Sequence, residues 1–250
     1  GLHLDDTTTV VESVKTRNHS EKMLGLEVEE KGNLSVIKVS SKNYPVPQEY
    51  NVPADISSAA FFIVFALLCE DSELILKNVL LNETRAGIIK VLQQMGGNIE
   101  IIAEYKSGEE ISGDLLIKSS QLNNIEIDKE IIPNIIDEIP ILSIAGLFAE
   151  GKFEIKNAEE LRLKETDRIN AMVSNFRKLG VKIEESIDGF SVEGKIKDVC
   201  NVYKSFGDHR IAMSFSILSM LLNNGGKIDD FDCVNISNPN FINQINSIVR

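Results

Sequence analysis

The stretch Asp208-His-Arg-Ile-Ala-Met-Ser-Phe-Ser-Ile-Leu218 joins one acidic residue to a run that is almost wholly apolar. The same arrangement occurs at Asp55-Ile-Ser-Ser-Ala-Ala-Phe-Phe-Ile-Val-Phe-Ala-Leu-Leu68 and at Asp137-Glu-Ile-Pro-Ile-Leu-Ser-Ile-Ala-Gly-Leu-Phe-Ala149. A helix that is apolar on every side is buried on every side, and an aspartate can cap the free N–H groups at its start. Pro140 fits only a first helical turn, which places the start of the second helix near Asp137. These recurring buried helices decide the fold.

A second repeated unit is a helical pattern that ends in glycine and leads into a short strand. It occurs three times, with the glycine at Gly25, Gly96 and Gly180. Glycine ends a helix readily because it adopts the left-handed backbone conformation at little cost. In the third copy, helical spacing predicts one apolar face that comprises Ile169, Met172, Val173, Phe176 and Leu179.

Short runs rich in apolar and β-branched residues lie between the helices and predict strands, for example at 74–76, 114–118, 152–155 and 190–192. Strands and helices then follow one another as β-α-β-α-β-β units. This order belongs to the α/β (α+β) class, with about three and a half units in the chain. The closing segment Ser237-Asn-Pro-Asn-Phe-Ile-Asn-Gln-Ile245 predicts a last amphipathic helix with Ser237 as a candidate cap.

The composition narrows the class of partner. The 250 residues carry a formal net charge of -12, which argues against nucleic-acid binding because that binding rests on neutralising phosphates. No run of about twenty apolar residues predicts a membrane span. The chain does not begin with Met and has a polar, acidic start, so we expect no signal peptide and interpret the chain as a piece of a longer protein.

Cysteine and histidine usage gives no sign of a metal or of disulfide bonds. Cys69, Cys200 and Cys233 are widely spaced and form no C-x-x-C pair, which is typical of a reduced cytoplasmic protein. The three histidines, His3, His19 and His209, lack zinc-ligand spacing, so we expect no metal.

Cationic residues gather in two strings of this acidic chain. The first is Leu161-Arg-Leu-Lys-Glu-Thr-Asp-Arg168, in which Lys164 and Arg168 share a face if the turn is helical. The second is Lys204-Ser-Phe-Gly-Asp-His-Arg210, at the start of a predicted buried helix. Helix N-termini offer free N–H groups and partial positive charge, and arginine binds carboxylate or phosphate with a planar fork. Both strings are therefore candidate anion sites.

A simpler interpretation stays open at this point. The first string also fits an ion-paired helix start in solvent, and Asp-His-Arg also fits a cap followed by surface residues. An isolated Asp137 is more often a helix cap than a general base.

Five strings together resemble signatures of the 5-enolpyruvylshikimate-3-phosphate synthase family. They are the two cationic strings and the segments that begin Asp55-Ile-Ser-Ser, Asn82-Glu-Thr-Arg-Ala-Gly and Asp137-Glu-Ile-Pro. The resemblance covers essentially the whole chain. It implies the enolpyruvyl transferase fold of two globes, each built from three β-α-β-α-β-β units, here truncated at the N-terminus. Residues 1–53 would be a partial unit of the second globe, and residues 54–250 a C-terminal globe of three units.

The resemblance also implies an activity, which is transfer of the enolpyruvyl group of phosphoenolpyruvate to the 5-hydroxyl of shikimate 3-phosphate. Asp137 matches the residue that accepts the hydroxyl proton, and Glu165 matches a proton donor to the methylene carbon. Opposite proton transfers suit two carboxyl groups in different environments. Fixed cations suit the departing phosphate.

The resemblance assigns the remaining binding residues by position. The shikimate 3-phosphate site would comprise Thr16, Arg17, Asp137 and Lys164. The phosphoenolpyruvate site would comprise Arg168, His209 and Arg210. Ile236 stands where some members carry a lysine that contacts phosphoenolpyruvate. We expect no cofactor, a monomer at full length, a cytoplasmic location, and an inactive chain when the N-terminal part is absent.

Two other functions remain as alternatives. The sister transferase that acts on UDP-N-acetylglucosamine shares the fold, and fold alone does not decide function. Its C-terminal motifs do not resemble the Asp-His-Arg-Ile-Ala-Met string. A non-catalytic anion-binding module is the other alternative, and it would tolerate substitutions at Asp137 and Glu165.

Overall fold

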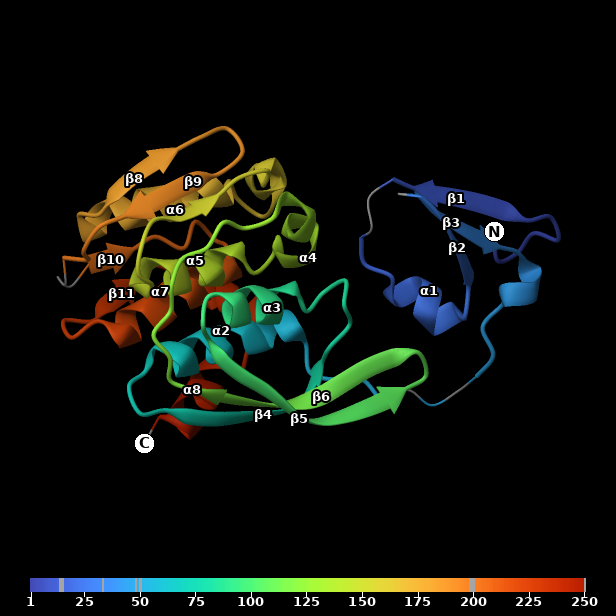
Figure 1. Ribbon diagram of the computed structural model, residues 1–250, viewed down its shortest axis with the longest axis horizontal. Helices are drawn as coiled ribbons and strands as arrows, with labels where there is room; N and C mark the ends of the chain where they lie inside the picture. Colours follow the sequence, from blue (N-terminus) through green and yellow to red (C-terminus); the bar gives the residue numbers. More distant parts are fainter. Residues whose placement is uncertain (14–15, 33, 48, 50, 198–200, 250) are drawn as a thin grey trace.

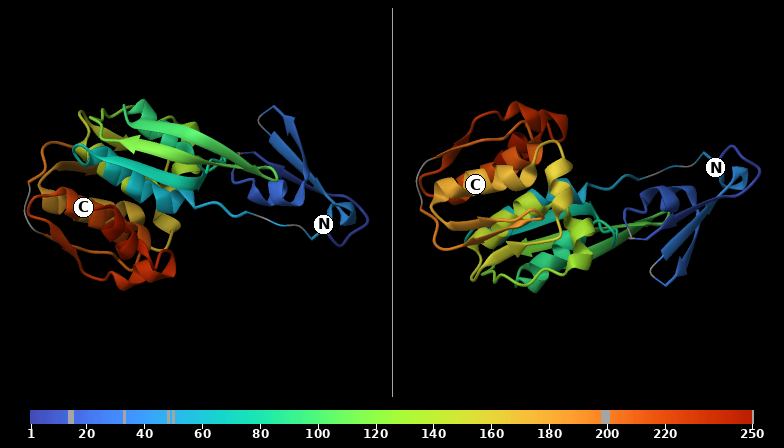
Figure 2. Two further views of the ribbon diagram at one scale, coloured as in Figure 1. Left: turned by 90° about the horizontal axis from the view of Figure 1, so that it is seen from below. Right: turned by 90° about the horizontal axis from the view of Figure 1, so that it is seen from above.

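The chain folds into two parts of unequal size (Figure 1). The computed structural model describes residues 1–13, 16–32, 34–47, 49, 51–197 and 201–249, so Cys200 lies outside the described residues. We call residues 1–43 the small part and residues 54–249 the large part. The segment 44–53 joins them (Figure 2).

In the first repeat of the large part, an apolar helix packs against an antiparallel sheet. Asp55 caps helix α2 (Ile56–Leu68) by accepting a hydrogen bond from the N–H of Ser58, as predicted. The sheet has the order β4-β6-β5. The other elements are β4 (Glu73–Leu80), α3 (Gly87–Gln94), β5 (Asn98–Ser107) and β6 (Glu110–Lys118). A parallel bridge between Ala54 and Val79 supplies the opening strand of the unit in minimal form.

The second repeat has the same plan, with sheet order β7-β9-β8. Pro140 lies in the first turn of α5, as expected. Gly146 of that helix faces the ring of Phe153, where an added Cβ would lie 2.1 Å from a ring carbon. The elements are α4 (Ile132–Ile135), α5 (Ile139–Phe148), β7 (Phe153–Ile155), α6 (Arg168–Phe176), β8 (Lys182–Glu185) and β9 (Phe190–Glu193).

The third repeat differs from the expected unit. Strands β10 (Asn201–Tyr203) and β11 (Gly226–Ile228) pair in parallel around α7 (His209–Leu221), and α8 (Phe241–Ile248) follows. Among the described residues, no hairpin comes after α8. The N-cap of α8 is Asn240, and Ser237 instead ends the preceding short 3₁₀ helix, so the prediction of Ser237 as the cap was wrong.

The three apolar helices form the centre of the large part. Helices α2, α5 and α7 contact one another in every pairing. Figure 1 shows the sheets outside them. The predicted apolar face of α6 is buried as well, although its last turn, Arg177–Leu179, tightens to a 3₁₀ helix that ends at Gly180 in the left-handed conformation. Helices without a polar face are thus accommodated by burial on all sides.

The small part is a three-stranded antiparallel sheet with the order β1-β3-β2 and one short helix. Its elements are β1 (Thr8–Glu12), α1 (His19–Leu24), β2 (Glu27–Lys31) and β3 (Leu34–Val39). Gly25 ends α1 with φ of 60°, as predicted. Helix α1 contacts β6, whose hairpin with β5 extends toward the small part (Figure 1).

Of the helices in the described ranges, none is by itself long and apolar enough to cross a bilayer. Only the segments Lys129–Ile135 and Ile139–Phe148 together meet the length and composition, and they are bent by 116°.

Candidate active site

Five helix starts in the large part bring charged side chains to one place. Asp55 and Asp208 cap α2 and α7, Glu138 precedes α5, and Arg168 is the first residue of α6. Arg85 lies two residues before α3. Because helix N-termini carry partial positive charge and free N–H groups, this arrangement favours anions at their meeting point.

Asp137 occupies the centre of this cluster. Its carboxylate forms an ion pair with Arg17 of the small part. Four cations of the large part also approach it, namely Arg85 (3.6 Å), Lys164 (3.8 Å), Arg168 (3.3 Å) and Arg210 (3.7 Å). Five cationic side chains from four segments of the chain therefore meet at one carboxylate.

The electrostatic surroundings lower the pKa of Asp137 to about 2. Burial by itself raises that pKa, but the charges of Arg210, Lys164 and Arg17 outweigh burial. Asp137 is therefore ionised at neutral pH. It does not cap α5, since Glu138 holds the N-cap position without a capping hydrogen bond. The simpler interpretation of Asp137 as a helix cap was wrong, because its carboxylate faces the cations instead of the helix N–H groups.

Arg168 is saturated by three carboxylates and is almost fully buried, with an exposed fraction of 1%. Its Nε donates to Asp208 at 2.8 Å, its Nη1 to Asp137 at 3.3 Å and its Nη2 to Glu165 at 2.5 Å. Asp208 also accepts the N–H groups of Arg210 and Ile211, so it caps α7 as predicted. Arg168 and the start of α7 are thus locked together.

Lys164 and Glu165 lie in the turn between the 3₁₀ helix Glu159–Leu163 and α6. The turn is not helical, so Lys164 and Arg168 do not share a helix face, yet both side chains reach Asp137. Lys164 also pairs with Glu160. The side chain of Glu165 is 49% exposed, so it is far more accessible than Asp137 at 11%.

His209 and Thr16 stand at the border of the cluster. His209 begins α7 next to Arg210, and burial together with the Arg210 charge lowers the pKa of its imidazole, so the ring is neutral at pH 7. Thr16 donates to Glu12 at 3.3 Å within the small part. The structure thus brings Arg17, Asp137, Lys164, Glu165, Arg168 and Arg210 together, with His209 adjacent and Thr16 turned toward β1.

Sequence reasoning assigned no role to two further charged residues of the cluster, Arg85 and Glu138. Arg85 was visible in the string Asn82-Glu-Thr-Arg85, but its carboxylate partners Asp55, Asp137 and Glu138 all lie far away in the chain. Glu138 was visible only as the neighbour of Asp137. Its side chain has no exposed surface and lies 3.8 Å from both Arg85 and Arg210.

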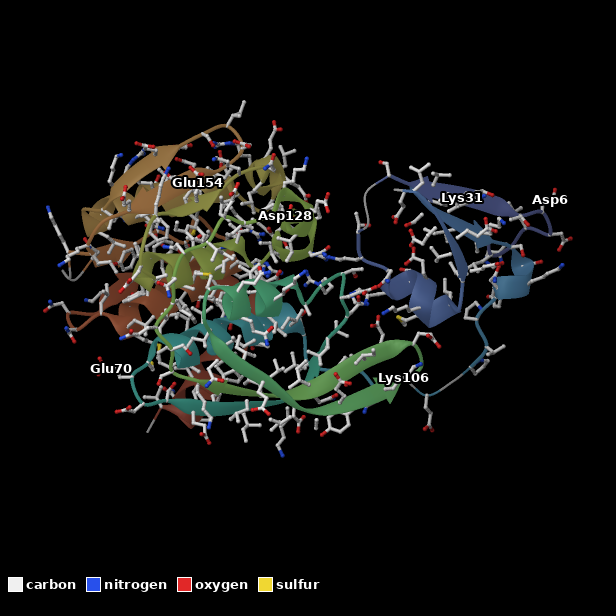
Figure 3. All side chains as sticks on the ribbon, in the orientation of Figure 1. Asp6, Lys31, Glu70, Lys106, Asp128 and Glu154 are labelled. Atoms are coloured by element: carbon white, nitrogen blue, oxygen red, sulfur yellow. The ribbon has the colours of Figure 1, made fainter. Side chains whose placement is uncertain are left out.

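The site contains no apparent metal centre within the ranges that the structure describes. No group of three or more His, Cys, Asp or Glu side chains there has a geometry suited to a metal ion. The cations of the cluster suit anionic groups instead. Charged side chains of both signs also cover both parts of the chain, for example at Asp6, Lys31, Lys106 and Asp128 (Figure 3).

Comparison with known proteins identifies relatives along almost the whole chain. The EPSP synthase family (3-phosphoshikimate 1-carboxyvinyltransferase) matches residues 1–245. A 3-phosphoshikimate 1-carboxyvinyltransferase of Petrotoga mobilis is 49% identical over 96% of this chain and 56% of its own length. The protein of that name from Oceanobacillus iheyensis is 44% identical over 100% of this chain and 58% of its own length. The chain spans about half the length of the curated relatives it matches.

Solved structures confirm the predicted fold. EPSP synthase from Acinetobacter baumannii superposes with a TM-score of 0.87 at 37% identity, covering 97% of this chain and 56% of that protein. The enolpyruvyl transferase NikO from Streptomyces tendae has a TM-score of 0.70 at 14% identity, covering 98% of this chain and 56% of its own, a likeness of fold alone. The sequence strings, the fold and the match to the family model agree, and the chain belongs to the EPSP synthase family.

Proposed function

We propose that this chain supplies one wall of an active site that transfers the enolpyruvyl group of phosphoenolpyruvate to the 5-hydroxyl of shikimate 3-phosphate. The observation that carries the proposal is the convergence of five cationic side chains on Asp137 in a chain of net charge -12. Its relatives are named for this reaction. The two substrates together carry two phosphates and two carboxylates, which such cations can bind.

The cations divide between the substrates by position. Arg168 and Arg210, with His209 beside them, would hold phosphoenolpyruvate. Arg17 and Lys164 would hold shikimate 3-phosphate, with Thr16 added when the small part turns its hydroxyl inward. In the structure these cations pair with protein carboxylates, so substrate anions must replace Asp137 and Glu165 as their partners. Binding is therefore an exchange of ion-pair partners.

This exchange prepares Asp137 to act as a base. A carboxylate with a pKa of about 2 accepts a proton poorly. When substrate phosphates draw Arg17, Lys164 and Arg210 away, the influences that lower the pKa of Asp137 weaken. Asp137 can then accept the proton of the 5-hydroxyl while the hydroxyl oxygen forms its bond to C2 of phosphoenolpyruvate.

The second half of the reaction needs a proton at the neighbouring carbon. Glu165 would deliver that proton to C3 and take one back when the bond from C2 to the phosphate oxygen breaks. Glu165 therefore ends the cycle with the proton it began with, and the hydroxyl proton held by Asp137 passes to the departing phosphate or to solvent. Arg168 and Arg210 would stabilise the negative charge of the departing phosphate. The addition and elimination require no organic cofactor.

Several broader features belong to the same proposal. Residues 1–53 would form part of a second globe and residues 54–250 the C-terminal globe, with both substrates between them. We place the protein in the cytoplasm as a monomer at full length. The chain alone would bind anions but not turn over, because one wall of the crevice supplies only part of the positioning.

Phosphate release from the two substrates tests this function. We define the full-length protein as this chain extended to the length of its relatives. It should release phosphate from phosphoenolpyruvate only when shikimate 3-phosphate is present, and this chain alone should lose turnover by a factor of about 10⁵, the scale of positioning effects. Turnover with UDP-N-acetylglucosamine would favour the sister activity. Absence of turnover with either acceptor would favour an anion-binding module.

A further inference from the structure

Glu138, the residue after Asp137, has a fully buried side chain. It has an exposed fraction of 0%. Its Oε1 accepts a hydrogen bond from the hydroxyl of Ser57 and lies 3.8 Å from Nη1 of both Arg85 and Arg210. Its Oε2 is buried without a hydrogen-bond partner among the described residues. A buried carboxylate is costly unless paired, so this one depends on its two arginines.

Arg85 is the second member of this buried group. It donates to the hydroxyl of Ser57, and it lies 3.6 Å from Asp137 and 3.6 Å from Asp55. Its side chain is only 8% exposed. Both Nη atoms of the guanidinium therefore lie against protein groups, and Arg85 could meet a substrate only by leaving Ser57 and the carboxylates beside it.

The two Nη atoms of the Arg210 guanidinium contact different groups. Its Nη1 donates to the backbone carbonyl of Asp137 at 3.1 Å and lies beside Glu138. Its Nη2 lies 3.7 Å from the carboxylate of Asp137, the group that an incoming anion would replace. One edge is thus anchored on the interior, and the other is available for exchange.

We propose that Glu138 and Arg85 are positioning residues, which with Ser57 form a buried support that fixes Arg210 and Asp137 for the transfer reaction. The proposal rests on the proposed function. Glu138 acts through Arg210 by holding its Nη1 edge, and Arg85 acts through Asp137 by fixing the direction of its carboxylate. Burial raises the pKa of Glu138, and the charges of Arg85 and Arg210 and the hydrogen bond from Ser57 offset only part of that rise.

The two residues should therefore affect different kinetic constants. In the full-length protein, Glu138→Gln keeps the size of the side chain and its bond to Ser57 but removes the charge that anchors Arg210. We expect KM for phosphoenolpyruvate to rise about 10-fold, the loss of one charge-assisted contact, with a change in kcat within about 3-fold. Arg85→Met should lower kcat about 10-fold, with KM for phosphoenolpyruvate nearly constant.

Three further variants separate positioning from loss of stability. Glu138→Asp retains the charge and should restore part of the affinity for phosphoenolpyruvate. Ser57→Ala leaves both charges in place and should raise the same KM only about 2-fold, and it stays measurable if Glu138→Gln does not fold. Ile117→Val is buried in β6 away from the cluster, so it should reduce stability without changing either constant.

The outcomes distinguish this inference from the proposed function. If the unmodified full-length protein releases no phosphate from the two substrates, the proposed function fails. If it is active while Glu138→Gln and Ser57→Ala keep its KM for phosphoenolpyruvate, the inference alone is overturned. The inference would also be overturned if the Glu138 and Arg85 variants lowered kcat and raised KM for both substrates to the same extent as Ile117→Val. That result would show a general effect of stability.

Discussion

The large and small parts contribute to one site but are held together by different forces. In the large part, α2, α5 and α7 bury their apolar side chains against one another and against three sheets. Among the described residues of the small part, only Ile37 is a fully buried apolar residue. Burial of apolar area stabilises a fold by about 25 cal/mol per Å². The large part therefore has its own source of stability, whereas the small part largely lacks one.

Polar contacts take the place of a core between the two parts. Glu110, at the start of β6, accepts a hydrogen bond from the side-chain amide of Asn82 at 3.0 Å. The same carboxylate is hydrogen-bonded to Nδ1 of His19 at 2.6 Å and lies 3.8 Å from Nζ of Lys22. Asn82 also donates to Asn18 at 2.8 Å. This group and the Arg17–Asp137 ion pair position α1. Four cations of the site thus extend from segments of the part that has a packed core, whereas Arg17 extends from a part held by partly exposed hydrogen bonds and ion pairs.

Hydrogen exchange offers the largest test of this difference. In this chain, amides of α2, α5 and α7 should exchange at least about 10³-fold more slowly than those of α1 and β1–β3, because core helices open only with most of the fold. Mass spectrometry of peptides after timed exchange measures both regions in one sample. Equal protection in the two parts would break the comparison.

Substitution of Asp137 should affect both parts at once. In the full-length protein, Asp137→Asn should lower kcat about 10²-fold or more, because proton acceptance is lost. The same change in this chain removes the group that competes for Arg17, Lys164 and Arg210. Inorganic phosphate should therefore bind more tightly, and α1 should exchange faster because Arg17 loses its anchor.

Calorimetric titration with phosphate and the exchange of α1 check these expectations. Glu160→Gln is a suitable control, because it removes an exposed carboxylate beside Lys164 that does not touch Arg17. Weaker phosphate binding by Asp137→Asn than by the control would contradict the exchange of ion-pair partners.

Much of the large part could be predicted from its sequence because the decisive signals are local. The caps Asp55 and Asp208, the first-turn Pro140 and the helix-ending Gly180 each act within a few residues of their position. The third repeat was harder, since the helix pattern at its end does not indicate whether strands follow.

The site was only partly accessible to the same reasoning. The cationic strings indicated Lys164, Arg168 and Arg210, and the resemblance added Arg17 and Asp137. Arg85 and Glu138 could not be assigned, because their partners are brought close only by the packing of α2, α5 and α7. Long-range electrostatic contacts carry no periodic signal in the sequence.

Acidification should reveal how much the ion pairs of Asp137 contribute to the free energy of unfolding. Its pKa is lowered from 3.8 to about 2, so its ionised form stabilises the folded state above about pH 4. That stability is lost as the pH falls through 4 toward 2, and the shift corresponds to about 2 kcal/mol. Urea unfolding of this chain at pH 7 and pH 3 measures the effect. Asp137→Asn should lose less stability over that interval, and an identical loss would show that Asp137 is not the group responsible.

The smallest expected effect concerns the polar group at Glu110. Glu110→Gln keeps the length of the side chain but removes the charge that faces His19 and Lys22. Partly exposed ion pairs contribute at most about 1 kcal/mol, so overall stability should hardly change. The position of α1 should become less restricted, because the small part has little core to hold it.

Two measurements detect that change. Exchange of α1 amides should accelerate by about 2- to 5-fold, and in the full-length protein KM for shikimate 3-phosphate should rise by a similar factor while KM for phosphoenolpyruvate stays constant. Glu73→Gln is the matched control, because Glu73 pairs with Lys118 at 3.0 Å on the same sheet but far along the strand from the small part. If both variants change α1 equally, or if the phosphoenolpyruvate constant moves instead, then Arg17 is not positioned through Glu110, and the small part is held by contacts other than this polar group.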